Sequence, residues 1–349
     1  MSALARLRLA GGATALRALG LTALGRRRFG WFPTVLTYHG VHDGSLPDDL
    51  YAYNTKHVHV DDFERQLRWL THHYDIVPLA EVQAVIASGQ WRPRLLALTF
   101  DDGYENNYRV AWPVLRRMSL PATIFVTTDI IDRQRPYDHD RVELALRCAD
   151  RADVCLSDAG TLQVIPLRTP ADRSRAVYAV KAWLAKLPGA AADRLRGQIF
   201  EQLWSDGLLA ENRVAYQPMS WDQVRELADA GVEIGSHTVS HPHLARLEPG
   251  DIARELSDSR ARLESRIGRP VVRVSYPFGS HDARVMAAAR SAGYESAYIT
   301  HTWYAQSPRE PFAIPRISVA GGAPFALFVA ATTRALQLIG RGEAGAREN

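Results

Sequence analysis

Short β-rich runs alternate with helix-patterned segments along most of this chain. The runs are Val35–Tyr38, Ile76–Leu79, Leu95–Phe100, Thr123–Thr127, Val232–Ser236, Val271–Tyr276, Ser296–Thr300 and Ile314–Val319. Between many of them, apolar residues recur three and four positions apart, as in Phe63, Leu67 and Leu70. Such alternation places parallel strands inside a layer of helices. Seven or eight strands of this kind predict an α/β fold, namely a closed or nearly closed (β/α) barrel.

One long segment, at about residues 132–218, interrupts this alternation. Its pattern predicts the helices Arg141–Ala149, Arg173–Leu187 and Ala191–Trp204 and a short hairpin at Val154–Leu167. An insert of this size either shapes access to a site or is a structural cap. We therefore predict three parts. They are a basic amphipathic segment (1–30), a barrel with this insert (31–320), and a C-terminal helix, Pro324–Ile339, with a tail (321–349).

Positive charge is concentrated at the start of the chain, although the net charge is only +4. Residues 1–30 hold six arginines and no acid, and the first carboxylate is Asp43. The remaining body is nearly neutral, which gives no support to nucleic-acid binding. Glycines and arginines interrupt the leucines of the segment, so it is too short and too polar to span a membrane. It either lies on an anionic membrane surface or is a solvated terminus.

Two features bear on the compartment. The two cysteines, Cys148 and Cys155, have a spacing that is typical neither of a disulfide framework nor of a metal site. The first 30 residues show no clear apolar core followed by a cleavage site. We therefore expect reduced thiols and a cytoplasmic protein, with peripheral contact to an anionic membrane through residues 1–30.

The apolar run Leu95–Phe100 leads directly into Asp101, Asp102 and Gly103. In a barrel, catalytic groups gather at the carboxyl ends of the strands, and Gly103 allows a sharp turn there. Two adjacent acids in different environments can divide the chemistry, one binding a cation and the other taking a proton. The alternative is ordinary turn or helix-capping chemistry, which uses the same residue types.

Two histidines, His237 and His241, follow the run Val232–Ser236. On a helical turn, residues four apart share one face, with Cβ atoms roughly 5–6 Å apart. This spacing suits two imidazoles on one metal, and a carboxylate from Asp101-Asp102 completes three protein ligands with one open position. That pattern is typical of a catalytic rather than a structural zinc site. The same donor set also accepts Co²⁺, Ni²⁺ or Fe²⁺.

These segments resemble the signature motifs of the NodB-type polysaccharide deacetylases, carbohydrate esterase family 4. The first two motifs are similar to Thr99-Phe100-Asp101-Asp102-Gly103 and His237-Thr238-Val239-Ser240-His241, and the third to Val274-Ser275-Tyr276-Pro277-Phe278-Gly279. The resemblance implies an incomplete or distorted (β/α) barrel of about seven parallel strands with a helical insertion. It implies one divalent metal, Zn²⁺ by preference, on Asp102, His237 and His241, with Asp101 as the base. The backbone N–H of Phe278 would hold the oxyanion.

The chain departs from the family pattern around the base. Ser275 stands where many members carry an arginine that orients the base. We expect Arg273 or Arg316 to take that role, and the structure must decide between them.

The family's late Leu-x-x-His motif, which supplies the general acid, and the Asp-containing motif that tunes its histidine have no convincing counterpart. The segment Thr37–His42 resembles the Tyr-His element of one branch of the family. His39 is therefore the candidate general acid. Its alternative role is a hydrogen bond to Asp101 or to the metal ligands, and His281 and His301 are weaker candidates.

Metal-dependent removal of N-acetyl groups from hexosamines of a polysaccharide or glycolipid-type glycan is the activity that the resemblance implies. The predicted substrate contacts are Tyr104, Ser275, Pro277, Phe278 and Arg316, with stacking from Trp112, Trp221 and Trp303 set against the commoner core role of such residues. Hydrolysis of an O-acetyl ester or a cyclic amide on the same scaffold is one alternative. Non-catalytic glycan binding is the other, but a binding module has no need of a base such as Asp101.

Overall fold

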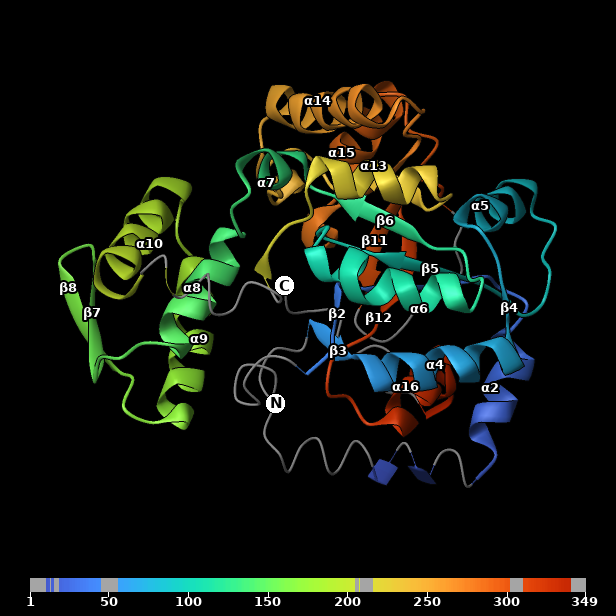
Figure 1. Ribbon diagram of the computed structural model, residues 1–349, viewed down its shortest axis with the longest axis horizontal. Helices are drawn as coiled ribbons and strands as arrows, with labels where there is room; N and C mark the ends of the chain where they lie inside the picture. Colours follow the sequence, from blue (N-terminus) through green and yellow to red (C-terminus); the bar gives the residue numbers. More distant parts are fainter. Residues whose placement is uncertain are drawn as a thin grey trace. The chain divides into compact units, whose positions relative to one another are not determined.

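The computed structural model describes residues 11–12, 14–15, 19–44, 56–204, 207, 216–301 and 310–339. Its central strands are β1 Thr34–Tyr38, β5 Leu95–Phe100, β6 Thr123–Val126, β9 Glu233–Ser236, β10 Arg273–Ser275, β11 Ser296–His301 and β12 Ile314–Ser318. These seven parallel strands form a ring in the order β1-β12-β11-β10-β9-β6-β5, and β5 pairs back to β1 (Figure 1). The closing pair runs from Thr34 with Leu96 to Tyr38 with Phe100. The predicted (β/α) barrel is confirmed, and its ring is closed rather than incomplete.

Alternate residues of each strand face the barrel interior and the surrounding helices, because side chains alternate along a strand. Val35 belongs to a buried cluster with residues of helix α5 (Leu79–Ser88), which packs against the amino ends of the strands. Its neighbour Leu36 belongs to a second cluster with residues of helix α4 (Val60–His73). The barrel interior and the helix layer are therefore two separate apolar cores.

Helices surround the ring, as Figure 1 shows for α4, α6, α13 and α14. The other described α-helices that accompany the barrel are α2 Leu21–Phe29, α6 Trp112–Arg117, α7 Thr128–Arg133, α13 Trp221–Asp229, α14 Pro249–Ile267, α15 Ala283–Ser291 and α16 Phe325–Thr332. Asn107–Ala111 (η1) form a π-helical turn, and Leu244–Arg246 (η2), Pro277–Gly279 (η3) and Ala335–Ile339 (η4) form 3₁₀ turns.

The strand predicted at Ile76–Leu79 is wrong in both length and place. Strand β4 (Asp75–Ile76) is short and pairs with the first half of β5, outside the ring. Pro78 has no N–H to donate to a neighbouring strand, and its fixed φ suits the start of a helix, so α5 begins at Leu79. A parallel pair that the sequence did not predict joins β2 (Gly40–His42) to β3 (His57–His59).

The single amphipathic helix predicted from Pro324 to Ile339 is also wrong. Helix α16 ends at Thr332, and Arg334 takes a left-handed φ of 56° before η4 begins. Arg334 Nη2 donates to the carbonyl oxygen of Pro33 at 3.2 Å, which holds the break. The side chains of Leu327–Thr332 are all buried, so α16 packs on all sides instead of presenting one apolar face.

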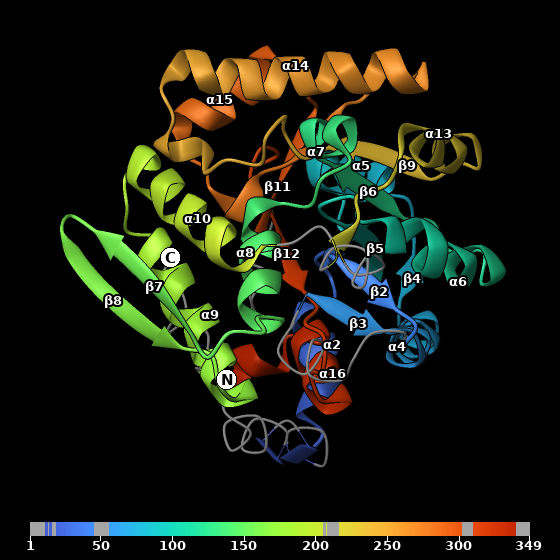
Figure 2. The ribbon, with the colours of Figure 1, turned by 60° about the vertical axis from the view of Figure 1, so that its left-hand side comes forward.

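The described residues between 135 and 217 form a second compact unit. It contains α8 Asp138–Arg147, the antiparallel pair β7 Asp153–Asp158 and β8 Thr161–Pro166, α9 Pro170–Leu184 and α10 Gly189–Leu203. The three predicted helices and the hairpin are confirmed with bounds shifted by a few residues. Within this unit the hairpin lies beside α10 (Figure 2), whose Gln198 and Gln202 side chains bond to the backbone of β7.

Gly235 tests the packing of the barrel interior. A Cβ atom at this position in β9 would overlap the ring of Phe125 on β6, which is buried against Tyr298. We expect Gly235→Ala to lower the free energy of unfolding by about 1–3 kcal/mol, measured by urea denaturation. The control is Gly197→Ala in α10, where nothing lies within 4 Å of the added atom and the free energy should rise by roughly 0.5–1 kcal/mol. An unchanged midpoint for Gly235→Ala would contradict this packing.

Candidate active site

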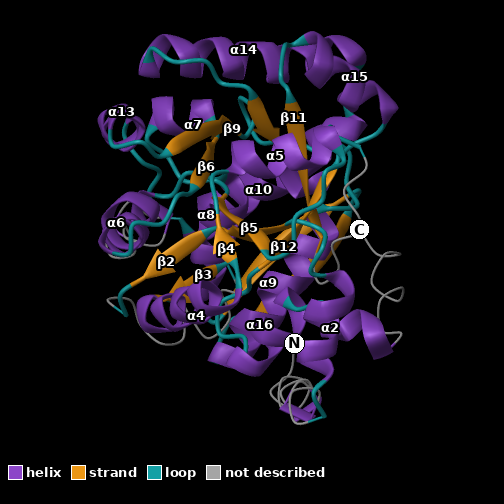
Figure 3. Ribbon diagram, turned by 90° about the vertical axis from the view of Figure 1, so that its right-hand side faces the viewer, coloured by secondary structure: helices purple, strands orange, loops and turns teal. Residues whose placement is uncertain are grey.

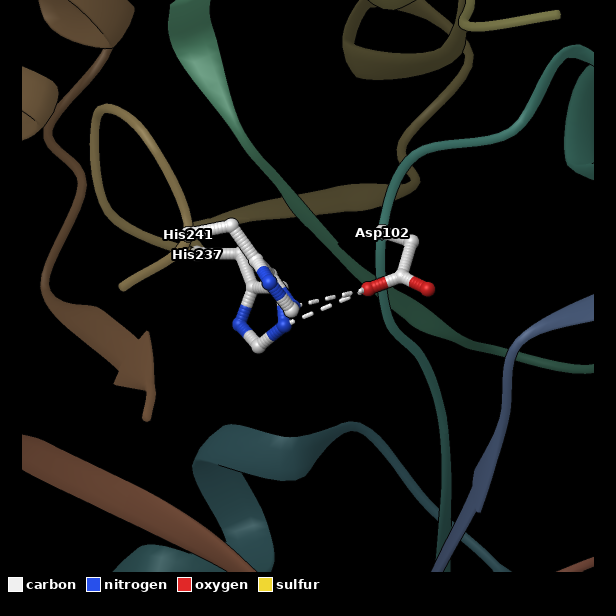
Figure 4. Close-up of side chains that lie close together, drawn as sticks. All are labelled: Asp102, His237 and His241. Atoms are coloured by element: carbon white, nitrogen blue, oxygen red, sulfur yellow. Dashed lines mark ion pairs between the residues drawn. The ribbon is translucent and has the colours of Figure 1, made fainter. Parts of the chain in front are cut away.

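Asp102, His237 and His241 lie together, although they come from two different loops. Nε2 of each histidine lies 3.4 Å from Oδ1 of Asp102. Figure 4 shows both imidazole rings facing that carboxylate oxygen. One ligand atom from each residue lies within 4.8 Å of the other two, and in the part of the chain that the structure describes no other such trio of His, Cys, Asp or Glu occurs. Two imidazoles and a carboxylate are the donor set of a catalytic divalent-metal site.

The imidazole of His237 is held in a metal-binding orientation. Its Nδ1 lies 2.8 Å from the carbonyl oxygen of Ser275. A carbonyl oxygen only accepts, so Nδ1 donates, and the neutral ring presents the lone pair of Nε2 toward Asp102. Burial lowers the pKa of His237, but Asp101 and Asp102 outweigh burial and raise it. The two carboxylates therefore make this position favourable for positive charge, which a proton or a metal ion can supply.

The expectation that the two histidines share a helical turn is wrong. They lie in a loop after β9, where Thr238 and His241 have left-handed φ angles of 69° and 63°. The Thr238 hydroxyl accepts from the backbone N–H of His241 at 3.1 Å. Glu255 on α14 accepts from two further backbone N–H groups of this loop, at 2.8 and 2.9 Å. Sequence reasoning missed Glu255, because nothing local marks a helix residue that anchors a loop.

The turn after β5 separates the two adjacent aspartates. Asp102 and Gly103 both have left-handed φ, 74° and 72°. A Cβ atom at Gly103 would lie 2.9 Å from Cγ1 of Val126, so only glycine fits without movement. The backbone turns between Asp101, which stays in line with the barrel interior, and Asp102, which faces the histidines.

A bidentate ion pair between Asp101 and Arg316 crosses the barrel interior. Arg316 Nη1 donates to Oδ1 at 2.8 Å and Nη2 donates to Oδ2 at 2.6 Å. Nη2 also donates to the Ser275 hydroxyl at 2.7 Å, and that hydroxyl lies 3.3 Å from Oδ2 of Asp101. Arg316 has no exposed surface, and Asp101 is 2% exposed. Such a pair fixes both oxygens of the carboxylate in place.

The structure decides between the two candidate arginines. Arg273 pairs with Glu233 at the other end of the interior, away from Asp101. Arg316 contacts Asp101 directly. Burial raises the pKa of the Asp101 carboxyl, but the charge and hydrogen bonds of Arg316, helped by His237, outweigh burial and leave that pKa below its ordinary value. Asp101 is therefore ionised at neutral pH.

His39 lies at the same end of the barrel as the aspartates. It directly follows β1, and the pairing of Tyr38 with Phe100 places His39 level with Asp101. Burial lowers the pKa of the His39 imidazole more than the charges of Asp102 and Asp101 raise it. The geometry places His39 at the candidate site without a hydrogen bond to Asp101 within the described residues.

Lys56 also lies at the candidate site, although no motif marks it in the sequence. Its Nζ lies 3.9 Å from Oδ2 of Asp102 and donates to the Tyr104 hydroxyl at 3.1 Å. The residue lies far from the recognised motifs in sequence, and only the tertiary fold brings its ammonium group to the Asp102 carboxylate.

Phe278 is the one predicted substrate contact that is open to solvent, with 48% of its surface exposed. Its φ of 58° is left-handed. The ring stacks on His243 with centroids 4.0 Å apart and meets His241 edge to face at 4.7 Å. The third motif therefore places an exposed aromatic ring beside a histidine of the candidate metal site.

The other predicted substrate contacts lie inside the protein. Tyr104, Ser275, Pro277 and Arg316 are all buried. Ser275 and Arg316 bond to Asp101, and Tyr104 bonds to Lys56. In this arrangement Ser275, Arg316 and Tyr104 hold other side chains of the site, and the contacts of all four residues with a substrate stay predictions.

The other residues named as candidates from the sequence lie in different parts of the chain. His281 Nδ1 lies 2.8 Å from the carbonyl oxygen of Gly279. Trp112 stacks on Tyr108, and Trp221 donates to Asp132. Trp303 and the side chain of His301 lie outside the described residues. Cys148 and Cys155 are not joined to each other by a disulfide.

Comparison with known proteins identifies the chain's relatives. The polysaccharide deacetylase family model matches residues 88–160 and 176–297, more than half of the chain. The Bacillus subtilis protein YxkH is 21% identical over 291 residues, 82% of this chain and 71% of the relative. A poly-β-1,6-N-acetyl-D-glucosamine N-deacetylase of Staphylococcus aureus is 27% identical over 115 residues, 31% of this chain and 40% of that protein.

Solved structures show the same fold. The Streptococcus pyogenes deacetylase PplD, in complex with acetate, has 18% sequence identity and a TM-score of 0.57, over 86% of this chain and 98% of that chain. The motifs that contain Asp102, His237 and His241 fall inside the matched ranges, as do the strands before them. The chain belongs to the polysaccharide deacetylase family of hydrolases.

Proposed function

We propose that this chain removes N-acetyl groups from hexosamine residues of a glycan, with the help of one divalent metal ion. One observation carries the proposal. A second buried carboxylate, Asp101, lies beside a complete Asp-His-His donor set without belonging to it. A site that only bound a metal or a sugar has no use for that additional ionised group.

Asp102, His237 and His241 would hold the metal, because their ligand atoms converge and His237 already presents Nε2. A bound divalent cation, Zn²⁺ by preference, lowers the pKa of water and polarises the acyl carbonyl. Each of the three ligands comes from a loop at the carboxyl end of a barrel strand, where this architecture places its chemistry.

Asp101 is the proposed general base. Arg316 keeps its carboxylate ionised, so the group is ready to accept a proton from the attacking water. The bidentate contact also prevents the carboxylate from rotating, so its two oxygens keep a fixed orientation in the site.

The developing oxyanion and the leaving nitrogen need donors. The backbone N–H of Phe278, beside His241, is the proposed donor to the oxyanion. His39 is the proposed donor to the leaving nitrogen. The ionised carboxylates of Asp101 and Asp102 raise the pKa of His39, but burial lowers that pKa by more, so the imidazole has to take up a proton before it can donate one.

Two features bear on the substrate class. The Staphylococcus aureus relative is a deacetylase of a polymer of N-acetylglucosamine, although the match covers 40% of that protein. The exposed ring of Phe278 at the site suits contact with a sugar or with the acetyl methyl group. Both features favour an N-acetylated hexosamine.

Acetate release tests this proposal. The chain is incubated with N-acetylated oligosaccharides, with and without a chelator, alongside Asp101→Asn. We expect release to stop with the chelator, to return with Zn²⁺ or Co²⁺, and to fall on the order of 10²–10⁴-fold in Asp101→Asn. Hydrolysis of O-acetyl esters or cyclic imides alone would contradict the substrate. Metal binding without hydrolysis of any of these compounds would leave a non-catalytic module.

Arg316→Met tests the base more closely. Asp101 acts only when it is deprotonated, so activity disappears as pH falls through the pKa of Asp101. Arg316 holds that pKa down and burial raises it. Without Arg316, the loss should therefore begin at a higher pH, and kcat should fall on the order of 10²-fold, as a pH–rate profile would measure.

Arg273→Met is the matched control, because it removes a buried arginine of the same barrel that pairs with Glu233 instead. In the pH–rate profile of Arg273→Met, activity should be lost at the same acidic pH as in the wild type. If the pH at which activity is lost rises equally in both variants, the change reflects a general loss of structure. That result would contradict the role of Arg316.

A further inference from the structure

One side of helix α2 is both basic and apolar. The helix carries Arg26, Arg27 and Arg28 in its last turn and no acid in its first turn. Leu24, Arg27 and Arg28 are exposed and follow the spacing i, i+3 and i+4, which places them on one side, and the exposed Trp31 follows two residues after the helix ends. Leu24 is 49% exposed and Trp31 is 55% exposed.

The opposite side of α2 is fixed against the C-terminal region. Gly25 approaches the Thr333 carbonyl oxygen and the Ala335 backbone so closely that a Cβ atom would overlap them. Thr22, on the same side, is buried. Figure 3 shows α2 beside α16 at one end of the barrel. The helix cannot turn to bury Leu24 and Trp31 without breaking this contact.

A second segment extends the exposed surface. The Trp91 ring meets Phe32 edge to face with centroids 5.3 Å apart, and Arg94 N–H donates to the Gly30 carbonyl oxygen at 2.9 Å. Trp91 is 36% exposed. We call Leu24, Arg27, Arg28, Trp31 and Trp91 the basic-aromatic face.

The exposed apolar side chains of the barrel unit gather mainly at and beside the basic-aromatic face. Among the described residues of the barrel unit, the exposed large apolar side chains are Leu19, Leu24, Trp31, Trp91 and Phe278. Phe278 belongs to the active site, and the other four lie on α2, next to it, or on the adjoining Trp91 loop. Scattered single apolar residues are normal, but a group of them beside arginines indicates an interaction surface.

We propose that the basic-aromatic face binds the headgroup region of an anionic lipid bilayer. Arginines next to the surface are attracted by anionic headgroups, and tryptophan prefers the membrane–water interface. Leu24 supplies apolar area that can enter the boundary with the acyl chains. Within the described residues, no helix has the length and apolar character needed to cross a membrane, so the contact is peripheral.

The face also fixes the orientation of the active site. Trp31 precedes β1 and Trp91 precedes β5, at the amino ends of these strands, whereas His39 and Asp101 follow their carboxyl ends. Five- or six-residue strands separate the two levels by roughly 15–20 Å. A chain bound through this face holds its active site on the side away from the lipid. The substrate glycan is thus one that extends out from the bilayer.

Vesicle co-sedimentation of the full chain tests the proposal. Vesicles of phosphatidylcholine with about one third phosphatidylglycerol are compared with pure phosphatidylcholine. We expect binding to the anionic vesicles that weakens at high salt, and a loss of roughly tenfold or more in Arg27→Glu/Arg28→Glu. Trp31→Ser should also weaken binding, and far-UV circular dichroism shows whether each variant is folded.

The matched controls change the same residue types elsewhere. Arg225→Glu/Arg254→Glu gives the same change in net charge on α13 and α14, and Leu162→Ser removes an exposed apolar side chain from β8. Both controls should bind as the wild type does. Equal binding to neutral vesicles, or equal loss in the controls, would overturn the proposal. A wild-type dimer that only the face variants dissociate, without any vesicle binding, would make the face a protein–protein interface and would also overturn it.

Discussion

The ion pair between Asp101 and Arg316 is the interaction on which the rest of the site depends. Both groups are removed from water at a large desolvation cost, and only good geometry offsets that cost. The bidentate contact provides this geometry, and hydroxyls of Thr99, Thr300 and Ser275 accept the further donors of the guanidinium. Since Arg316 is on β12 and Asp101 follows β5, the pair spans the closure of the ring on either side of β1.

Closure of the barrel brings the functional loops to one place, and left-handed backbone then aims their side chains. Nine non-glycine residues in the described part of the chain have positive φ. Four of them, Asp102, Thr238, His241 and Phe278, lie at the candidate site. Such conformations cost energy and persist only when the surroundings hold them, as Glu255 does for the histidine loop. Local strain at these positions therefore supports the functional assignment independently of the motifs.

The sequence could predict what depends on periodicity and short motifs. The alternation of apolar strand runs with helix-patterned segments predicted the ring. The motifs around Asp101 and the two histidines predicted the residues that converge at the candidate metal site. The choice between Arg273 and Arg316 depends on register instead. Arg316 pairs with Thr300 on β11, whereas Arg273 pairs with Ser296, four residues earlier and roughly 13 Å toward the other end. No pattern within either strand contains that offset.

Three other features depend on tertiary contacts and could therefore not be predicted from the sequence. The spacing of His237 and His241 fits a helix, but a loop held by a distant glutamate achieves the same convergence. Lys56 reaches Asp102 only after the chain has folded. The basic segment at the start of the chain suggested a membrane contact, but Trp91 joins that surface through packing against Phe32, which the sequence does not show.

The most direct test of the central claim is X-ray absorption spectroscopy on the metal-free chain loaded with one equivalent of Zn²⁺. The account predicts one tightly bound ion with two histidine nitrogens at about 2.0–2.1 Å, lost in His237→Ala and retained in Asp101→Asn. An ion that stays bound in His237→Ala, or a shell without histidine nitrogen, would contradict the assignment of Asp102, His237 and His241 as the metal site.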